Sequence, residues 1–143
     1  MTTIREIAAA CNVSIATVSN ILNGNGKRKA SERKQKLVLE KAQAVYQAKE
    51  QEFGFPIMRE LERVIMLRVV DEYWMDHIDA MQDLRQAIRL QAYAQNDPVQ
   101  AYQRESMHMF DEMIAAIQEE TVRRLYSVRL KSNEEIKRER VAT

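Results

Sequence analysis

At 143 residues, with 45% apolar and 30% charged residues, the chain has the size and composition of one soluble domain or two small ones. This length excludes a large enzyme, and the single cysteine, Cys11, excludes an intrachain disulfide and a cysteine-based zinc site. No apolar run approaches the roughly 20 residues of a membrane-spanning helix. We therefore expect a cytoplasmic protein without membrane insertion, with Cys11 acting as a small buried apolar side chain.

The net charge of +1 is unevenly distributed along the chain. Residues 1–36 contain seven Lys or Arg and two Glu, a net charge of +5, which leaves −4 for the remainder. A basic amino-terminal segment indicates either a polyanionic partner or a solvated basic linker, and charge alone does not separate the two.

Helix-forming residues dominate, and only three glycines and two prolines interrupt them, so we expect an all-α fold. Ser and Thr side chains at the right spacing predict the start of each of the first three helices. The predicted caps and helices are Thr3 with Glu6 for 4–11, Ser14 for 15–22, and Ser31 for a helix from 32 toward 52.

Two long helices are predicted in the second half of the chain. From Ile57 onward, apolar residues recur every three or four positions, which indicates one buried stripe of a long helix. Asp97 and Pro98 then predict the start of a second long helix, and the short connection "LQAYAQND" makes the pair an antiparallel hairpin. The first stripe comprises Ile57, Leu61, Val64, Leu67, Val70, Trp74, Ile78, Met81, Leu84 and Ile88; the second comprises Val99, Tyr102, Phe110, Met113, Ile117 and Leu125.

The segment 1–46, and "VSIATVSNILNG" within it most specifically, resembles the LacI-type helix-turn-helix DNA-binding domain. The resemblance implies that double-stranded DNA is bound in the major groove by the second helix. It places Ile15, Ala16 and Asn20 against the bases. It places phosphate contacts at Thr3, Ser14, Thr17, Ser19 and Asn23, and the basic run Lys27, Arg28 and Lys29 adds to them.

Several departures from that family are visible. The chain reads "VYQAKEQEFGFP" where such proteins continue into a hinge helix, and it lacks their dimerising core. A three-helix cap that does not bind DNA is the alternative interpretation of this segment.

Residues 46–128 resemble the helical-wing end and two-helix finger of SecA, the ATPase of bacterial preprotein translocation. The runs "WMDHIDAMQDLRQ" and "AYAQNDP" carry the resemblance. It implies that the loop between the two helices contacts the SecY channel or the moving polypeptide, with Tyr93 at the tip and Gln95 supporting it. No G-x-x-x-x-G-K-[ST] sequence is present, so we expect no motor activity. The two histidines, His77 and His108, have no partners at the spacing of a catalytic nucleophile and base, so we expect no other enzymatic activity and no cofactor.

Two further patterns have ordinary structural interpretations. A row of carboxylates at Glu72, Asp76, Asp79 and Asp83 is typical of a solvated helix face, and we predict no metal site there. The seven internal methionines all lie in the hairpin, and we expect them, with Trp74, to pack between its helices rather than form a peptide-binding groove.

Together these patterns predict a DNA-binding head at 1–46, a SecA-like helical hairpin at 47–130 and a polar tail at 131–143. The leading functional hypothesis is a transcription-regulator-like DNA-binding module that the hairpin dimerises. The alternative is a SecA translocase fragment that binds SecY, SecA or unfolded preprotein. Because one hairpin cannot bury both stripes, we also expect homo-oligomers.

Overall fold

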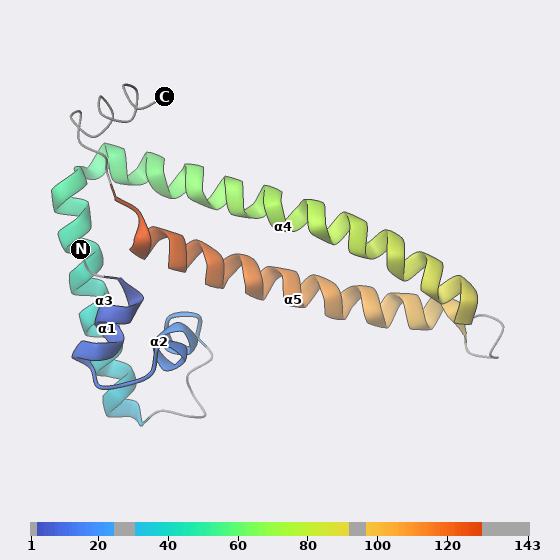
Figure 1. Cartoon of the computed structure of the whole chain (residues 1–143), viewed down its shortest axis with the longest axis horizontal. Helices are drawn as coiled ribbons and strands as arrows, with labels where there is room; N and C mark the ends of the chain where they lie inside the picture. Colours follow the sequence, from blue (N-terminus) through green and yellow to red (C-terminus); the bar gives the residue numbers. More distant parts are fainter. Residues whose placement is uncertain (1–2, 25–30, 92–96, 130–143) are drawn as a thin grey trace, which may run out of the picture. The chain divides into compact units, whose positions relative to one another are not determined.

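Every secondary-structure element that the structure describes is a helix, which confirms the all-α prediction. A computed structural model of the chain describes residues 3–24, 31–91 and 97–129 (Figure 1). Its helices are α1 (Ile4–Ala10), α2 (Ile15–Leu22), α3 (Glu32–Phe53), α4 (Phe55–Gln91) and α5 (Pro98–Ser127). None of them contains a stretch that is long and apolar enough to cross a bilayer.

The predicted helix starts are confirmed by their capping hydrogen bonds. The Ser14 hydroxyl accepts the backbone N–H of Thr17 at 3.1 Å, and the Asp97 carboxylate accepts that of Val99 at 3.0 Å. These side chains pair amide hydrogens that the first turn of a helix leaves without backbone partners. Gly54 ends α3 at φ 84°, a left-handed conformation that glycine adopts without a Cβ clash, and α4 begins at the next residue.

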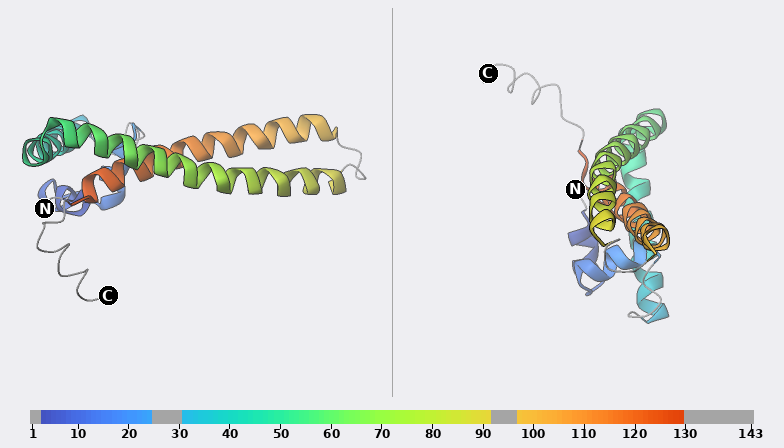
Figure 2. Two further views of the ribbon diagram at one scale, coloured as in Figure 1. Left: turned by 90° about the horizontal axis from the view of Figure 1, so that it is seen from above. Right: turned by 90° about the vertical axis from the view of Figure 1, so that its right-hand side faces the viewer.

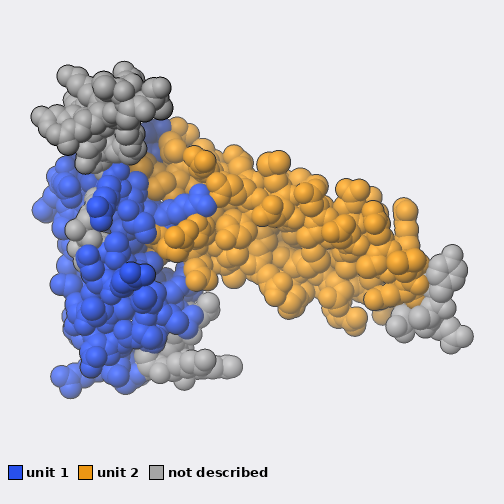
Figure 3. Space-filling model, viewed as in Figure 1, with its two compact units in different colours: residues 1–60, 124–143 blue, residues 61–123 orange. Residues whose placement is uncertain are grey.

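The chain forms two compact units, residues 1–60 with 124–143 and residues 61–123 (Figure 3). The core of the first unit contains Ile7, Val18 and Val38, one from each of the first three helices, and Cys11 is also buried as expected. The end of α5 belongs to this same unit. A separate three-helix DNA-binding head is therefore not confirmed, because α3 also contacts residues from the other end of the chain.

In the second unit, α4 and α5 run side by side in opposite directions (Figures 1 and 2). Residue 69 of α4 is fully buried, and Ile88 of α4 and Met113 of α5 are nearly so. The rings of His77 and Phe110 join the two helices, with centroids 6.1 Å apart in an edge-on arrangement. The predicted antiparallel packing of two long helices describes this unit correctly.

Candidate functional site

A buried lysine binds the carboxyl end of α5 to α3. The Lys49 ammonium donates hydrogen bonds to the backbone carbonyls of Leu125 (2.9 Å), Tyr126 and Val128 (3.3 Å). The three carbonyls lie at the carboxyl end of α5 or just after it, where a helix leaves carbonyls without N–H donors of its own and a cation meets the negative end of the helix dipole. Only 3% of Lys49 is exposed, and this burial lowers its pKa from the usual 10.5, although Glu52 partly opposes the shift.

Tyr126 makes the second contact of this α3–α5 anchor. Its hydroxyl donates to the Ala42 carbonyl at 2.9 Å, and its ring lies 5.9 Å from that of Tyr46. Burial raises the pKa of the Tyr126 phenol above its usual 10.0. The anchor was not predicted: a lysine in the polar run "QAKEQ" looks like a solvated side chain, and its acceptors lie more than seventy residues away in sequence.

Replacing Tyr126 with phenylalanine is expected to lower the free energy of unfolding by about 1 kcal/mol, because the Ala42 carbonyl loses its buried donor. The raised pKa also means that the folded protein keeps the phenol proton above pH 10.0, whereas the unfolded chain releases it. The free energy of unfolding of the wild type should therefore decrease as the pH rises past 10.0. The variant has no phenol at this position and should not show this decrease. Urea unfolding between pH 8 and 11 measures both effects, and identical pH profiles for the two proteins would contradict the assignment.

The hairpin exposes much of the apolar surface that its sequence was expected to bury. In the first predicted stripe, Ile88 is buried, but Ile57, Val64, Leu67, Trp74 and Ile78 are each about half exposed. In the second stripe Met113 is buried, whereas Val99 and Phe110 are exposed. The single-stripe prediction is wrong in part, because α4 has two apolar faces and a spacing of three or four fits residues from both.

The expectation for Trp74 and the methionines needs the same correction. Met58 and Met113 are buried, but Met66, Met75 and Met107 are more than half exposed. Trp74 is 47% exposed and its ring lies 5.7 Å from that of His77 on the same helix. Trp74 is therefore not packed between the two helices. It lies on an exposed face of α4 with Val64, Leu67 and Ile78, which we call the outer face.

An open groove follows this outer face along α4. Its volume is about 690 Å³, and its lining combines the apolar Trp74, Ile78 and Met81 with the basic Arg85 and Arg89. The other lining residues are His77, Gln82 and Gln86. A groove with apolar walls and cations at one end suits an apolar ridge that carries an acidic residue.

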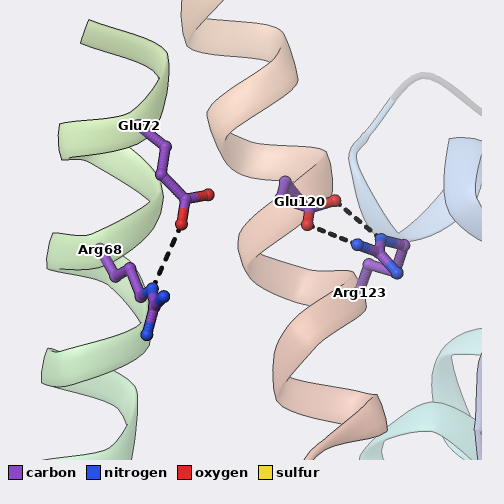
Figure 4. A network of polar contacts seen from close by, with 4 residues as sticks. All are labelled: Arg68, Glu72, Glu120 and Arg123. Carbon is purple, nitrogen blue, oxygen red and sulfur yellow. Dashed lines mark hydrogen bonds and ion pairs between the residues drawn. The ribbon is translucent and has the colours of Figure 1, made fainter. Parts of the chain in front are cut away.

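Two ion pairs on the hairpin surface each join residues of a single helix. Figure 4 shows Arg68 with Glu72 on α4, at 3.2 Å, and Glu120 with Arg123 on α5. Such exposed pairs contribute little to stability. In the described part of the chain no three His, Cys, Asp or Glu side chains are placed to hold a metal ion.

The residues predicted to contact DNA bases lie at the surface of the first unit. Ile15, Ala16 and Asn20 are exposed on α2. Of the predicted phosphate contacts, Ser14 and Thr17 bond to one another through their side chains at 2.8 Å, and the Asn23 amide donates to the Ser19 carbonyl at 2.9 Å. The Thr3 backbone N–H donates to Glu6 at 3.2 Å.

Five predicted site residues lie outside the described residues. They are the basic residues Lys27, Arg28 and Lys29 and the predicted finger-tip residues Tyr93 and Gln95. Their contacts stay predictions from the two resemblances.

Comparison with known proteins decides between those resemblances. The SecA wing and scaffold domain family matches residues 2–129, which is most of the chain and includes the amino-terminal segment. The chain belongs to this family. All five helices of the structure lie within the matched residues.

Relatives of this SecA-family chain are named protein translocase subunit SecA. One from Desulforudis audaxviator is 45% identical over 128 residues, which cover 87% of this chain and 14% of the relative. A relative from Pelotomaculum thermopropionicum is 53% identical over 94 residues, which cover 66% of this chain and 11% of the relative. A relative from Clostridium acetobutylicum is 59% identical over 87 residues, which cover 61% of this chain and 10% of the relative. The chain thus spans about a seventh or less of the length of these curated relatives.

The hypothesis that this chain is chiefly a DNA-binding transcription regulator is wrong. The SecA family match runs through residues 2–129 and so includes the segment assigned to a LacI-type domain, for which no separate support exists. Physically, two short capped helices joined by a tight turn are a common way to close a small helical core, and α1 and α2 do this with Ile7 and Val18. The translocase alternative is the one supported.

Proposed function

We propose that this chain is a helical scaffold segment of a SecA-type translocase and that its α4–α5 hairpin is the two-helix finger. In this proposal the loop between the helices contacts an unfolded preprotein, and the SecY channel or SecA itself is the neighbouring partner. The observation that carries the proposal is the family match over residues 2–129, since it includes both helices of the hairpin and the loop that joins them.

The geometry of the hairpin supports a role in holding a contact surface toward a partner, rather than a role in catalysis. Helices α4 and α5 contain 37 and 30 residues, and at about 1.5 Å per residue each extends more than 40 Å. They run in opposite directions, so the carboxyl end of α4 and the amino end of α5 lie at the same end of a long support. The sequence contains no phosphate-binding loop, and the proposal assigns the chain no ATP hydrolysis of its own.

Binding of a fluorescently labelled, unfolded secretory preprotein tests the proposed function. We expect saturable binding to the full chain and a five- to tenfold weakening, roughly 1 kcal/mol, in Tyr93→Ala, because loss of an aromatic contact typically costs about that much. Tyr93→Phe, which keeps the ring, should bind nearly as well as wild type. Fluorescence anisotropy at fixed salt measures all three.

The control is Ile15→Ala, which removes an exposed apolar side chain from the first unit and should leave the affinity unchanged. A parallel titration with SecY channel complexes in nanodiscs distinguishes polypeptide binding from channel binding. If neither is bound, or if Tyr93→Ala binds both as tightly as wild type, the proposed function is wrong.

A further inference from the structure

An asparagine–glycine sequence lies at the carboxyl end of α2. Asn23 is the C-cap residue of this helix and is partly buried, and Gly24 after it is exposed. Asparagine is a chemically labile residue, and it is most labile before glycine. Glycine has no side chain to hinder attack of its backbone nitrogen on the neighbouring side-chain amide. Asn23 is therefore a candidate for spontaneous chemical modification.

The reaction that this sequence permits exchanges a side-chain amide for an acid. The Gly24 nitrogen attacks the side-chain carbonyl carbon of Asn23, a new C–N bond forms, and the amide nitrogen leaves as ammonia with the proton of the Gly24 N–H. Water then opens one of the two C–N bonds of the cyclic imide, which yields aspartate or isoaspartate. The only reactant besides the chain is water, and the product carries one more negative charge.

In the folded protein the two reacting groups are held apart. The Gly24 N–H donates to the Ile21 carbonyl at 3.1 Å, and the side-chain amide of Asn23 donates to the Ser19 carbonyl at 2.9 Å. The backbone of Asn23 has φ −90° and ψ 10°, close to helical values. At this ψ the Gly24 nitrogen is turned away from the Cβ atom of Asn23, so the imide ring cannot close.

We propose that Asn23 is a deamidation site whose rate is set by opening of the carboxyl end of α2. When the last turn opens, the Gly24 nitrogen loses its acceptor and rotates toward the Asn23 side chain, and the imide forms. The observed rate is then the rate in the open chain multiplied by the fraction of molecules that are open. This modification does not depend on the translocase assignment, because it rests on α2 and the residues that follow it.

The product does not fit the closed site. The Asn23 amide donates to the Ser19 carbonyl at 2.9 Å, whereas a carboxylate has no N–H and places an oxygen against that carbonyl. It also adds a negative charge at the carboxyl end of α2, which the helix dipole disfavours. Val18 and Ile21 of the same helix are buried in the first unit. Each conversion therefore favours the open state and weakens the packing of these two residues.

Peptide mass spectrometry of the aged full chain tests the site. An Asn25→Ser background removes the second asparagine–glycine sequence, Asn25–Gly26. We expect Asn23 to convert to aspartate and isoaspartate about tenfold more slowly in the folded protein than in guanidinium chloride at the same pH and temperature. Asn12, which precedes the β-branched Val13, is the internal control and should remain unconverted in both. Equal rates for Asn23 in the folded and unfolded chain would overturn the proposal.

Cap variants test whether α2 controls the rate. Ser14→Ala removes the N-cap hydrogen bond of α2 and should speed conversion of the folded protein about threefold or more, with no change in guanidinium chloride. Ser31→Ala removes the corresponding hydrogen bond of α3 and should change the rate less than about twofold. Equal acceleration by both variants would refute opening at α2, because the whole unit would then have to open.

The effect of the product is measured with Asn23→Asp. This variant should lower the melting temperature by about 3 °C, because it loses the donor to Ser19 and adds a charge at the negative end of the helix dipole. Ala16→Asp is the matched control. It adds the same charge at an exposed position in the first turn of α2 and should change the melting temperature by less than about 1 °C. Wild-type stability of Asn23→Asp would show that the product fits the closed site, contrary to the proposal.

Discussion

Replacing Val69 with aspartate is expected to lower the free energy of unfolding of the hairpin by about 4 kcal/mol or more. Val69 has no solvent exposure, so the new side chain must either bury an unpaired carboxylate or force α4 away from its neighbours. Both routes remove apolar packing that holds the second unit together. Urea unfolding followed by far-ultraviolet circular dichroism measures the loss.

Met66→Asp is the matched control, because it introduces the same charge three residues earlier on the same helix. Met66 is 54% exposed, so its carboxylate stays hydrated and the cost should be within about 0.5 kcal/mol. Equal destabilisation by the two would show that Val69 does not lie on the buried face.

The helices were predictable because their boundaries depend on neighbouring residues. Ser14, Ser31 and Asp97 each accept an amide hydrogen from the first turn of their own helix, so residues three or fewer positions apart determine these starts. Gly54 and Pro98 mark the other boundaries in the same local way. These helix boundaries can therefore be predicted from the sequence without knowledge of the tertiary contacts.

The buried face of α4 was not predictable from spacing alone. Val69 is buried and Leu67 is half exposed, yet each is an apolar residue with apolar neighbours three or four positions away. Periodicity shows that a helix has an apolar face, but it cannot say which of two such faces meets α5. That choice is made by partners such as Phe110, which is far away in sequence.

The incorrect assignment of the amino-terminal segment to a DNA-binding regulator has a related cause. The pattern around Ser14 and Val18 specifies two short helices and a turn, and the structure contains them. The function of such a supersecondary unit cannot be inferred from its fold, because the function depends on which molecule binds exposed residues such as Ile15 and Asn20. The SecA resemblance is the one that the family match confirms, and that match includes both helices of the hairpin.

Replacing Lys49 with methionine is expected to lower the free energy of unfolding by about 2 kcal/mol. Methionine can fill the volume, but the carbonyls of Leu125 and Tyr126 then lose a charged donor without gaining water. Amide exchange at Val128, whose N–H bonds to the Arg124 carbonyl at the end of α5, should become about tenfold faster. Lys41→Met, an exposed position on the same helix, should change neither value appreciably.

The pH dependence of stability distinguishes the buried ammonium from a lysine that merely lies nearby. Burial lowers the pKa of Lys49 below 10.5, and Arg129 adds to the shift while Glu52 opposes it. Between the lowered value and 10.5 the unfolded chain binds more protons than the folded one, so this group makes stability rise with pH in that window. Lys49→Met should abolish the rise while leaving the fall above pH 10.0 that Tyr126 produces. If the free energies of unfolding of wild type and Lys49→Met changed with pH in the same way, the ammonium would be hydrated in the folded protein. Tyr126 would then be the residue that stabilises the α3–α5 anchor.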